Sequence, residues 1–187
     1  MLNPVFPIMP VYKMHGHQNT TKWTELVKPA TGADFPAQTL VSVNGANEVQ
    51  AYDLAIHNIA ISTEAAKDPI VGAVKAGPYF YATEKDEVLL DLIGDAKLVM
   101  TASWTGGTPV IYDPATHENQ PFEAAVDPAT GLVFIDLTTV GAGPFTIRGL
   151  YQAPHTPDPL NTGLPNDKRY NARVIVEVDP AIVFAGF

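Results

Sequence analysis

The sequence predicts an all-β fold: a β-sandwich of the jelly-roll or immunoglobulin-like type, with an extended N-terminal arm and one or two short helices. Two observations support this class. Residues 97–152 contain several β-like segments in succession, each closed by turn residues, as in a β-meander. In addition, 17 Pro and 14 Gly among 187 residues indicate many short elements joined by turns rather than long helices.

The meander begins with residues 97–105, where apolar and polar side chains alternate with the period of two that a half-buried strand shows. This alternation places Trp104 on the buried side of the first strand, and we expect Phe134 to be buried in a later one. The expected core strands are residues 98–104, 132–139, 145–151 and 172–178, and further strands are expected at 110–112, 122–126 and 182–184.

Turn residues close each of these strands. Gly106-Gly107 follows the first, and Asp-Pro pairs follow two others, at Asp113-Pro114 and Asp179-Pro180. Longer breaks at 127–131 and 141–144 combine the same residue types. Asp hydrogen-bonds to nearby backbone, Pro fixes φ and Gly readily adopts φ > 0, so each junction has a physical reason to turn.

The earlier part of the chain is expected to hold shorter strands. Residues 20–27 alternate as a strand and residues 38–43 are expected to form another, and Asn44-Gly45 after the second is the commonest two-residue hairpin signal. Residues 48–67 fit both helical spacing and strand alternation, so both assignments stay open. We interpret them as a strand followed by a helical turn at 63–67.

Residues 79–94 combine an aromatic strand with a segment that favours a helix. Tyr79 to Tyr81 are predicted to form the short strand. Thr83 and the acidic residues after it suit the first turn of a helix, and Gly94 suits its end. The alternative is a hairpin that turns at Gly94-Asp95.

Residues 1–35 are expected to form the extended arm and a first strand, and residues 36–187 the sandwich body. Prolines at positions 4, 7 and 10 exclude a helix and favour extended backbone. Apolar residues between these prolines are unusual in a free tail. The arm should therefore dock, either on a neighbouring subunit or as an edge strand on its own sheet. The partner-binding residues predicted in the arm are Val5, Phe6, Ile8 and Met9.

A Pro-rich loop at residues 153–170 is the second segment expected to touch a partner, because long loops commonly carry function. Leu160 and Leu164 are its predicted partner-binding residues. Four Asp and Asn side chains in this loop suggest calcium, but their spacing does not match the EF-hand and no bidentate Glu follows. They are Asp158, Asn161, Asn166 and Asp167.

The chain is acidic, with a formal charge of −9 and a pI of about 4.8. Nucleic-acid binding depends largely on clustered Lys and Arg, so no DNA or RNA partner is expected. The charge is uneven along the chain: residues 1–35 carry +1 and the remaining residues carry −10.

No run of apolar residues approaches the 18 or so that suggest a transmembrane helix, so no membrane partner is expected. Residues 1–28 lack the features of a secretory signal, which makes the cytoplasm of the cell that produces the chain the expected place of synthesis. With no cysteine, the sequence excludes disulfides and thiolate chemistry.

No motif of a hydrolase, nucleotide-binding or zinc-protease site occurs, and the chain is predicted not to be an enzyme and to use no cofactor or metal. His15 and His17 lie close in sequence but have no identifiable third ligand, and His57 is expected to be a structural histidine. Glu123 and Asp136 are the acids that a hydrolase would use, because a glycosidase pair need only be close in space.

Together, these features resemble the small accessory structural proteins of tailed-bacteriophage virions, in particular capsid decoration or cement proteins. Residues 101–107 and 141–147 carry the resemblance to the sandwich domains of that class. The resemblance implies a homo-oligomer, often a trimer, that stabilises a capsid shell by binding the major capsid protein or other virion subunits through arms and loops. Its location would be the capsid surface of the virion.

The alternative function is a carbohydrate- or receptor-binding sandwich of a phage tail or fibre. Five aromatic residues could stack on sugars: Trp23, Trp104, Tyr79, Tyr81 and Tyr151. Two or more of them on one open face would favour sugar binding, whereas burial would favour a structural role.

Overall fold

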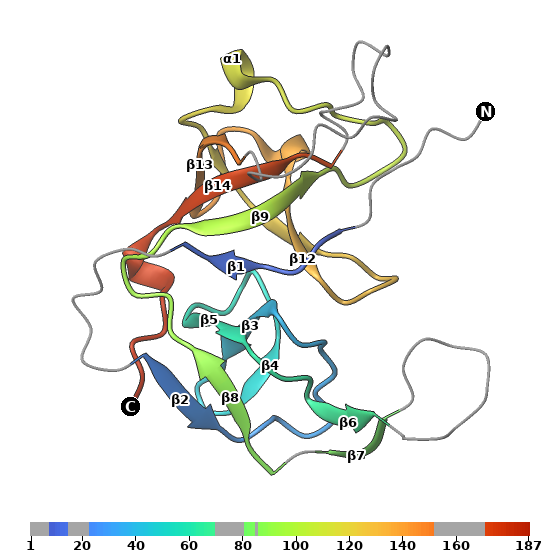
Figure 1. Cartoon of the computed structure of the whole chain (residues 1–187), viewed down its shortest axis with the longest axis vertical. Coiled ribbons are helices and arrows are strands. Elements are labelled where there is room, and N and C mark those ends of the chain that lie inside the picture. The colour runs from blue at the N-terminus through green and yellow to red at the C-terminus, as the bar shows by residue number, and fades with distance from the viewer. Residues whose placement is uncertain (1–7, 15–22, 70–80, 85, 152–170) are drawn as a thin grey trace.

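The computed structural model describes residues 8–14, 23–69, 81–84, 86–151 and 171–187. Its strands form a seven-stranded sheet, a five-stranded sheet and a two-stranded ribbon (Figure 1). The described helical elements are short: α1 (Pro114–His117) and the 3-10 turns η1 (Leu137–Thr139) and η4 (Pro180–Ile182). The predicted class, an all-β sandwich-like fold with short helices, is therefore confirmed.

The seven-stranded sheet forms the upper part of the molecule in Figure 1 and follows the order β10-β13-β14-β9-β12-β11, with β1 also paired to β9. Since Glu123 alone separates β10 from β11 along the chain, residues 121–126 join the two ends of this order, and the sheet closes on itself. Its strands are β1 (Tyr12–Lys13), β9 (Leu98–Ser103), β10 (Pro121–Phe122), β11 (Ala124–Val126), β12 (Val133–Asp136), β13 (Phe145–Leu150) and β14 (Arg173–Val178).

Strand β9 lies at the centre of this sheet. It pairs antiparallel with β14 along one edge, and its other edge is shared by β1, at Leu98 and Val99, and by β12, at Ala102 and Ser103. All six residues of β9 are buried. The predicted half-buried alternation was therefore wrong here, because a central strand in this position has both faces covered. Trp104 follows the end of the strand and is only half-buried.

The five-stranded sheet lies below the first in Figure 1 and follows the order β2-β8-β5-β3-β4. All its described pairings are antiparallel. The two-stranded ribbon lies beside it. The strands of the sheet are β2 (Thr24–Val27), β3 (Thr39–Val43), β4 (Val49–Ala51), β5 (Ile59–Ser62) and β8 (Val88–Asp91), and the ribbon contains β6 (Lys67–Pro69) and β7 (Tyr81–Glu84).

The hairpin predicted at Asn44-Gly45 joins β3 to β4. Asn44 Oδ1 accepts hydrogen bonds from the amides of Ala46, at 2.9 Å, and Glu48, at 3.0 Å, while the Asn44 amide donates to the Glu48 carbonyl at 2.9 Å. Asn47 adopts a φ of 62°. The side chain of Asn44 thus stabilises a connection longer than the two residues that the sequence signal suggests.

Two helical predictions in this half of the chain were wrong. Residues 63–67 form no helical turn; residues 48–67 instead contain β4, β5 and the start of β6. Residues 83–94 contain the end of β7 and the whole of β8. In β8 the side chains of Val88 and Leu90 are buried and alternate with half-buried ones, because β8 pairs with β2 on one side and β5 on the other. Pairing between distant segments outweighs the capping signal at Thr83.

Three of the strands predicted in the second half end early or are absent. Residues 110–112 form no strand, and Asp113 instead caps α1, with its Oδ1 accepting from the Ala115 amide at 3.1 Å. Strand β12 gives way to η1 at Leu137. The predicted terminal strand at 182–184 is reduced to a single bridge between Ile59 and Val183.

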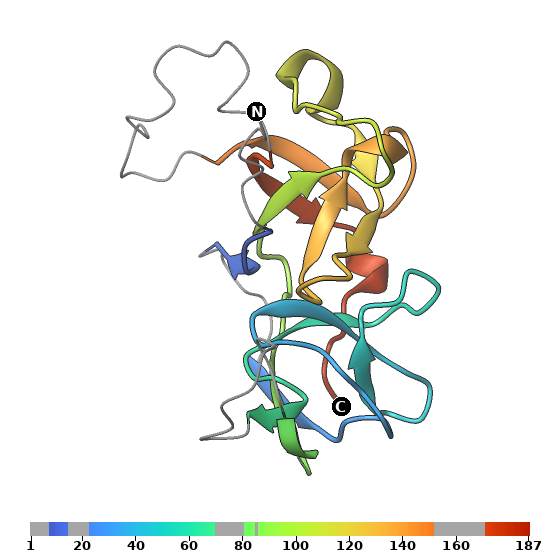
Figure 2. The same ribbon diagram turned by 90° about the vertical axis from the view of Figure 1, so that its right-hand side faces the viewer.

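The core of the protein consists of two hydrophobic clusters. The larger joins side chains of both sheets, so the sheets pack against each other (Figure 2). It includes Leu40, Ile59 and Ile61 from the smaller sheet with Leu98, Met100, Phe122, Ile135, Phe145, Val174 and Val176 from the larger. The second cluster includes Val27, Phe35, Val41, Ala60, Leu90 and Phe184. Phe184 belongs to the C-terminal segment, which crosses from β14 to the smaller sheet, where its amide donates to the Ile59 carbonyl at 2.9 Å.

Candidate protein-binding surface

Four large apolar side chains are exposed on the first two strands and the residues beside them. The exposed fractions are 40% for Met9, 49% for Tyr12, 56% for Trp23 and 55% for Leu26. We call these four residues the N-terminal surface. They belong to β1, to β2 and to the described residues just before each strand, and β1 lies above β2 in Figure 1.

The segment that carries Met9 and Tyr12 is fixed to the larger sheet. Val11 is fully buried in the larger cluster, and its amide donates to the Gln38 carbonyl at 2.8 Å. The Met9 amide donates to Thr101 Oγ1 at 3.0 Å, and Tyr12 lies opposite Val99 in the sheet. Residues 8–14 therefore lie as an edge strand on the chain's own sheet, which is the second of the two arrangements expected for the arm.

Lys13 connects the two halves of the N-terminal surface. Its ammonium group hydrogen-bonds to the Asp91 carboxylate and to the Leu92 carbonyl, the latter at 3.2 Å. The same ammonium lies 5.6 Å from the centroid of the Trp23 ring. Lys13 thus links β1 of the larger sheet to the end of β8 in the smaller one and positions the Trp23 ring next to β1.

Arg173 supports Tyr12 from the neighbouring strand β14. Its guanidinium lies 5.4 Å from the centre of the Tyr12 ring, and its Nη2 donates to the carbonyls of Pro10, at 3.1 Å, and Val99, at 3.4 Å. Burial lowers the pKa of Arg173, although the nearby Tyr12 and Tyr151 oppose that shift. The outer face of Tyr12 is therefore presented from a fixed position rather than from a loose chain.

Two of the six predicted partner-binding residues lie in the described part of the chain. Met9 is exposed and Ile8 is half-buried. The other four, Val5, Phe6, Leu160 and Leu164, lie outside the described residues, as does the whole of the predicted loop at 153–170.

Sequence reasoning missed three members of the N-terminal surface as partner-binding residues: Tyr12, Trp23 and Leu26. A usable signal was present for Tyr12, because an edge strand that buries Val11 must turn the next side chain outward. For Leu26, which alternates with the buried Val27, the same reasoning applies.

The aromatic residues considered for sugar stacking are divided between exposed and covered positions. Trp23 is exposed, whereas Trp104 and Tyr151 are half-buried. Tyr79 and the side chain of Tyr81 lie outside the described positions. Within the described part of the chain, one of the five candidates therefore stands on an open face, short of the two that sugar binding would favour.

Asp136, one of the two acids considered for hydrolysis, is occupied as a cap. Its carboxylate accepts hydrogen bonds from the amide and hydroxyl of Thr105, at 3.2 and 2.6 Å, and from the amide and hydroxyl of Thr138, at 3.0 and 2.7 Å. Burial opposes ionisation of Asp136, yet these hydrogen bonds hold its pKa below the ordinary value. The carboxylate is thus stabilised as the η1 cap. Half-buried Glu123 contacts Asp136 through the backbone, with its carbonyl accepting from the Asp136 amide at 3.0 Å.

The histidines do not converge in the described part of the chain. His15 and His17 lie outside it, and His57 is exposed rather than structural, because it sits in the turn before β5. The buried histidine is His117, whose Nδ1 accepts from the Asp113 amide at 2.8 Å. Among the described residues, no group of three His, Cys, Asp or Glu side chains could hold a metal ion.

The described helices are all too short to cross a membrane. Comparison with family models, curated proteins and solved structures finds no match to this chain or its fold.

Proposed function

We propose that this chain is a non-enzymatic structural protein of a tailed-phage virion, of the capsid decoration or cement type, and that the N-terminal surface binds the capsid shell. The observation that carries the proposal is the exposure of Met9, Tyr12, Trp23 and Leu26 on strands that are themselves anchored in the core. Met, Tyr and Trp are enriched in protein interfaces, so the exposure of these side chains supports a binding role.

The anchoring of these strands favours binding. Val11 and Val27 are buried in the two clusters, and Lys13 holds β1 against the smaller sheet. Because these contacts already order the strands, little conformational entropy remains to be lost when a partner binds, and the buried apolar area can contribute more fully to affinity.

The predicted arm residues extend the same surface along the sequence. Val5, Phe6 and Ile8 precede Met9 and alternate with prolines, which restrict the unbound chain. Leu160 and Leu164 remain a second predicted contact with the shell. Homo-oligomerisation, with a trimer as the form that the resemblance implies, is part of the same proposal.

A carbohydrate-binding function is the second candidate, and the exposed Trp23 favours it, because an indole ring can stack on a sugar. The Lys13 ammonium already lies over the same ring, which reduces the area open to a ligand. A glycan array with the wild-type protein distinguishes the two candidates: retention of a defined glycan that is lost in Trp23→Ala supports the second.

Particle composition tests the proposal directly. The chain should copurify with the capsid shells of the phage that encodes it, at a fixed copy number per major capsid subunit. It should also protect those shells against heat. Purified shells that lack the chain, or that contain it in variable traces, would contradict the proposal.

A further inference from the structure

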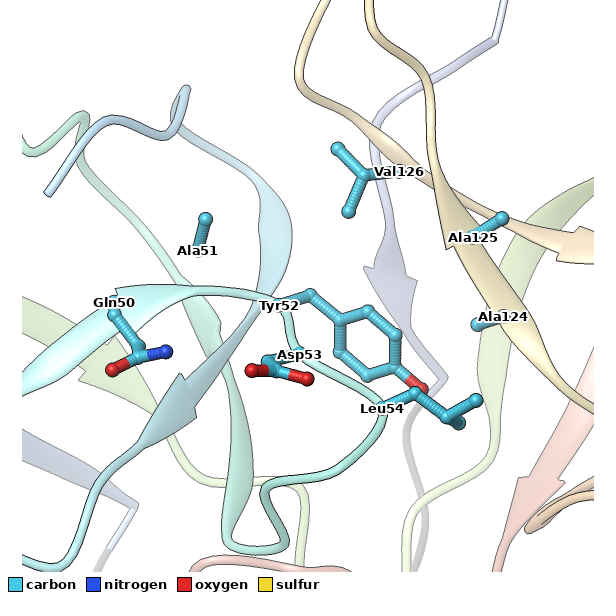
Figure 3. A pocket seen from close by; sticks show the side chains of 8 residues that line it. All are labelled: Gln50, Ala51, Tyr52, Asp53, Leu54, Ala124, Ala125 and Val126. Carbon is cyan, nitrogen blue, oxygen red and sulfur yellow. The ribbon is translucent and has the colours of Figure 1, made fainter.

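An open groove of about 440 Å³ separates the two sheets on the side where β4 faces β11 (Figure 3). One wall comes from the end of β4 and the residues after it, and the other from β11. The lining residues are Gln50, Ala51, Tyr52, Asp53, Leu54, Ala124, Ala125 and Val126. Because three consecutive residues of β11 line it, the groove faces the edge of that strand rather than one of its faces.

The edge of β11 toward the groove is unpaired. The Asp127 amide donates to the Leu132 carbonyl at 2.8 Å, and the Asp136 amide donates to the Glu123 carbonyl at 3.0 Å. In an antiparallel pair, residues that hydrogen-bond to the partner strand alternate with residues that do not, so the N–H and C=O groups of Ala124 and Val126 point away from β12. No residue in the described ranges pairs with them. Two donors and two acceptors therefore form a short strand edge without a backbone partner among the described residues.

The side chains beside this edge are apolar, with one negative charge. Leu54 and Val126 are exposed on opposite walls, and the Tyr52 ring lies buried between them (Figure 3). Asp53 is the charged residue of the lining, which contains no Lys or Arg. Burial, followed by the charges of Glu123 and Asp53, raises the pKa of Tyr52, so its hydroxyl stays neutral.

We infer that this groove binds an extended segment of a partner protein, which adds as a strand to the open edge of β11. Its apolar side chains would pack on Leu54 and Val126, and a Lys or Arg would lie near Asp53. Main-chain hydrogen bonds supply affinity in such strand addition, and the flanking side chains supply specificity.

The negative charge of this chain favours a basic partner segment in the groove over a second copy of the same chain. A second copy of this acidic chain, docked edge to edge by the same groove, would bring Asp53 and Glu123 toward their own counterparts, and like charges in close contact are unfavourable. A basic segment is attracted instead. The groove shares no residue with the N-terminal surface, so a result at one site does not decide the other.

Two synthetic nine-residue peptides test the inference on the full chain, one alternating Val and Lys and the other alternating Val and Glu. We expect the Val–Lys peptide to bind at least tenfold more tightly, with the difference reduced at high salt because the attraction is electrostatic. Hydrogen exchange of the Ala124 and Val126 amides should slow at least tenfold when this peptide binds.

Matched variants locate the binding. The double variant Leu54→Ser/Val126→Ser should weaken the Val–Lys peptide at least tenfold, and Asp53→Asn should weaken it several-fold at low salt only. Val140→Ser removes an equally exposed apolar side chain outside the groove and should bind as wild type does. Equal binding of the two peptides, protection of other amides instead, or dimerisation of the free protein through Val126 would each overturn the inference.

Discussion

The ammonium group of Lys13 lies 5.6 Å from the centroid of the Trp23 ring while it also hydrogen-bonds to Asp91. A single side chain therefore joins the first strand of one sheet to the end of β8 in the other and holds an exposed indole in place. Lys13 therefore contributes both to the contact between the two sheets and to the position of the Trp23 ring on the N-terminal surface.

Lys13→Met should destabilise the protein by about 1–2 kcal/mol, because it leaves the partly buried Asp91 carboxylate without its cation. Lys28→Met is the matched control. Lys28 is exposed and lies 3.5 Å from Glu48, so its loss should cost less than about 0.5 kcal/mol. Urea unfolding of both variants measures the difference, and equal losses would show that Lys13 does not tie the sheets together.

Gly143→Ala should be severely destabilising, by more than about 3 kcal/mol. A methyl group at this position would collide with the backbone of Phe122 and Glu123, and the φ of 102° already disfavours any other residue. Gly141→Ala, with a φ of 88° and open space around the added carbon, isolates the backbone contribution and should cost about 1 kcal/mol. Thermal unfolding of the two variants should differ by at least several degrees, and similar melting temperatures would contradict the close approach of residue 143 to β10.

Asp136→Asn should lower stability at neutral pH and do so less in acid. The folded-state pKa of Asp136 lies below its unfolded value, so its contribution is present above the unfolded pKa of about 4 and is lost as pH falls through the folded pKa. The difference in unfolding free energy between wild type and variant should therefore be constant from pH 7 to about 5 and shrink below pH 4. A difference that is independent of pH would show that the hydrogen bonds from Thr105 and Thr138 do not favour the ionised form.

Phe134→Ala should cost about 3–5 kcal/mol, because Phe134 is buried in β12. Trp104→Ala should cost clearly less, since Trp104 lies beyond the end of β9 and is half-buried. Chemical denaturation of the two variants tests this order. The reverse order would mean that β9 continues through Trp104 into the core.

Local signals in the sequence predicted the fold class and several of the strands. Gly131, at a φ of 74°, closes the turn at 127–131 where its Asp-Pro-Ala-Thr-Gly sequence indicates one, and β3, β13 and β14 lie close to the strands predicted at 38–43, 145–151 and 172–178. These features depend on residues close in sequence. They can therefore be predicted from the sequence without knowledge of the tertiary structure.

Pairing between distant segments could not be predicted in the same way. The acidic residues after Thr83 suit a helix, yet Val88 and Leu90 belong to a strand because β2 and β5 lie on either side of it. Likewise, β1, β12 and β14 all pair with β9, and all six of its residues are buried. The alternation of its own residues carries no trace of those neighbours.

The candidate surface was predicted in part for the same reason. Met9 was identified from the apolar residues between prolines. Tyr12, Trp23 and Leu26 could be identified only by knowing which side of each segment faces the core. The groove beside β11 depends on a chain that pairs with β13 up to Phe122 and with β12 from Ala124 onward, which leaves the other edge of β11 unpaired. Sequence alone gives no sign of that change.

Incorporation of a surface variant into capsid shells tests the central claim most directly. Tyr12→Ser/Trp23→Ser removes two exposed rings, and Val140→Ser removes an exposed apolar side chain elsewhere, with folding of each verified by circular dichroism. Occupancy on shells that lack the chain, measured by quantitative mass spectrometry after sedimentation, should fall at least tenfold for the double variant and stay at the wild-type level for Val140→Ser. Wild-type occupancy of the folded double variant would contradict the assignment of the N-terminal surface as the capsid-binding site.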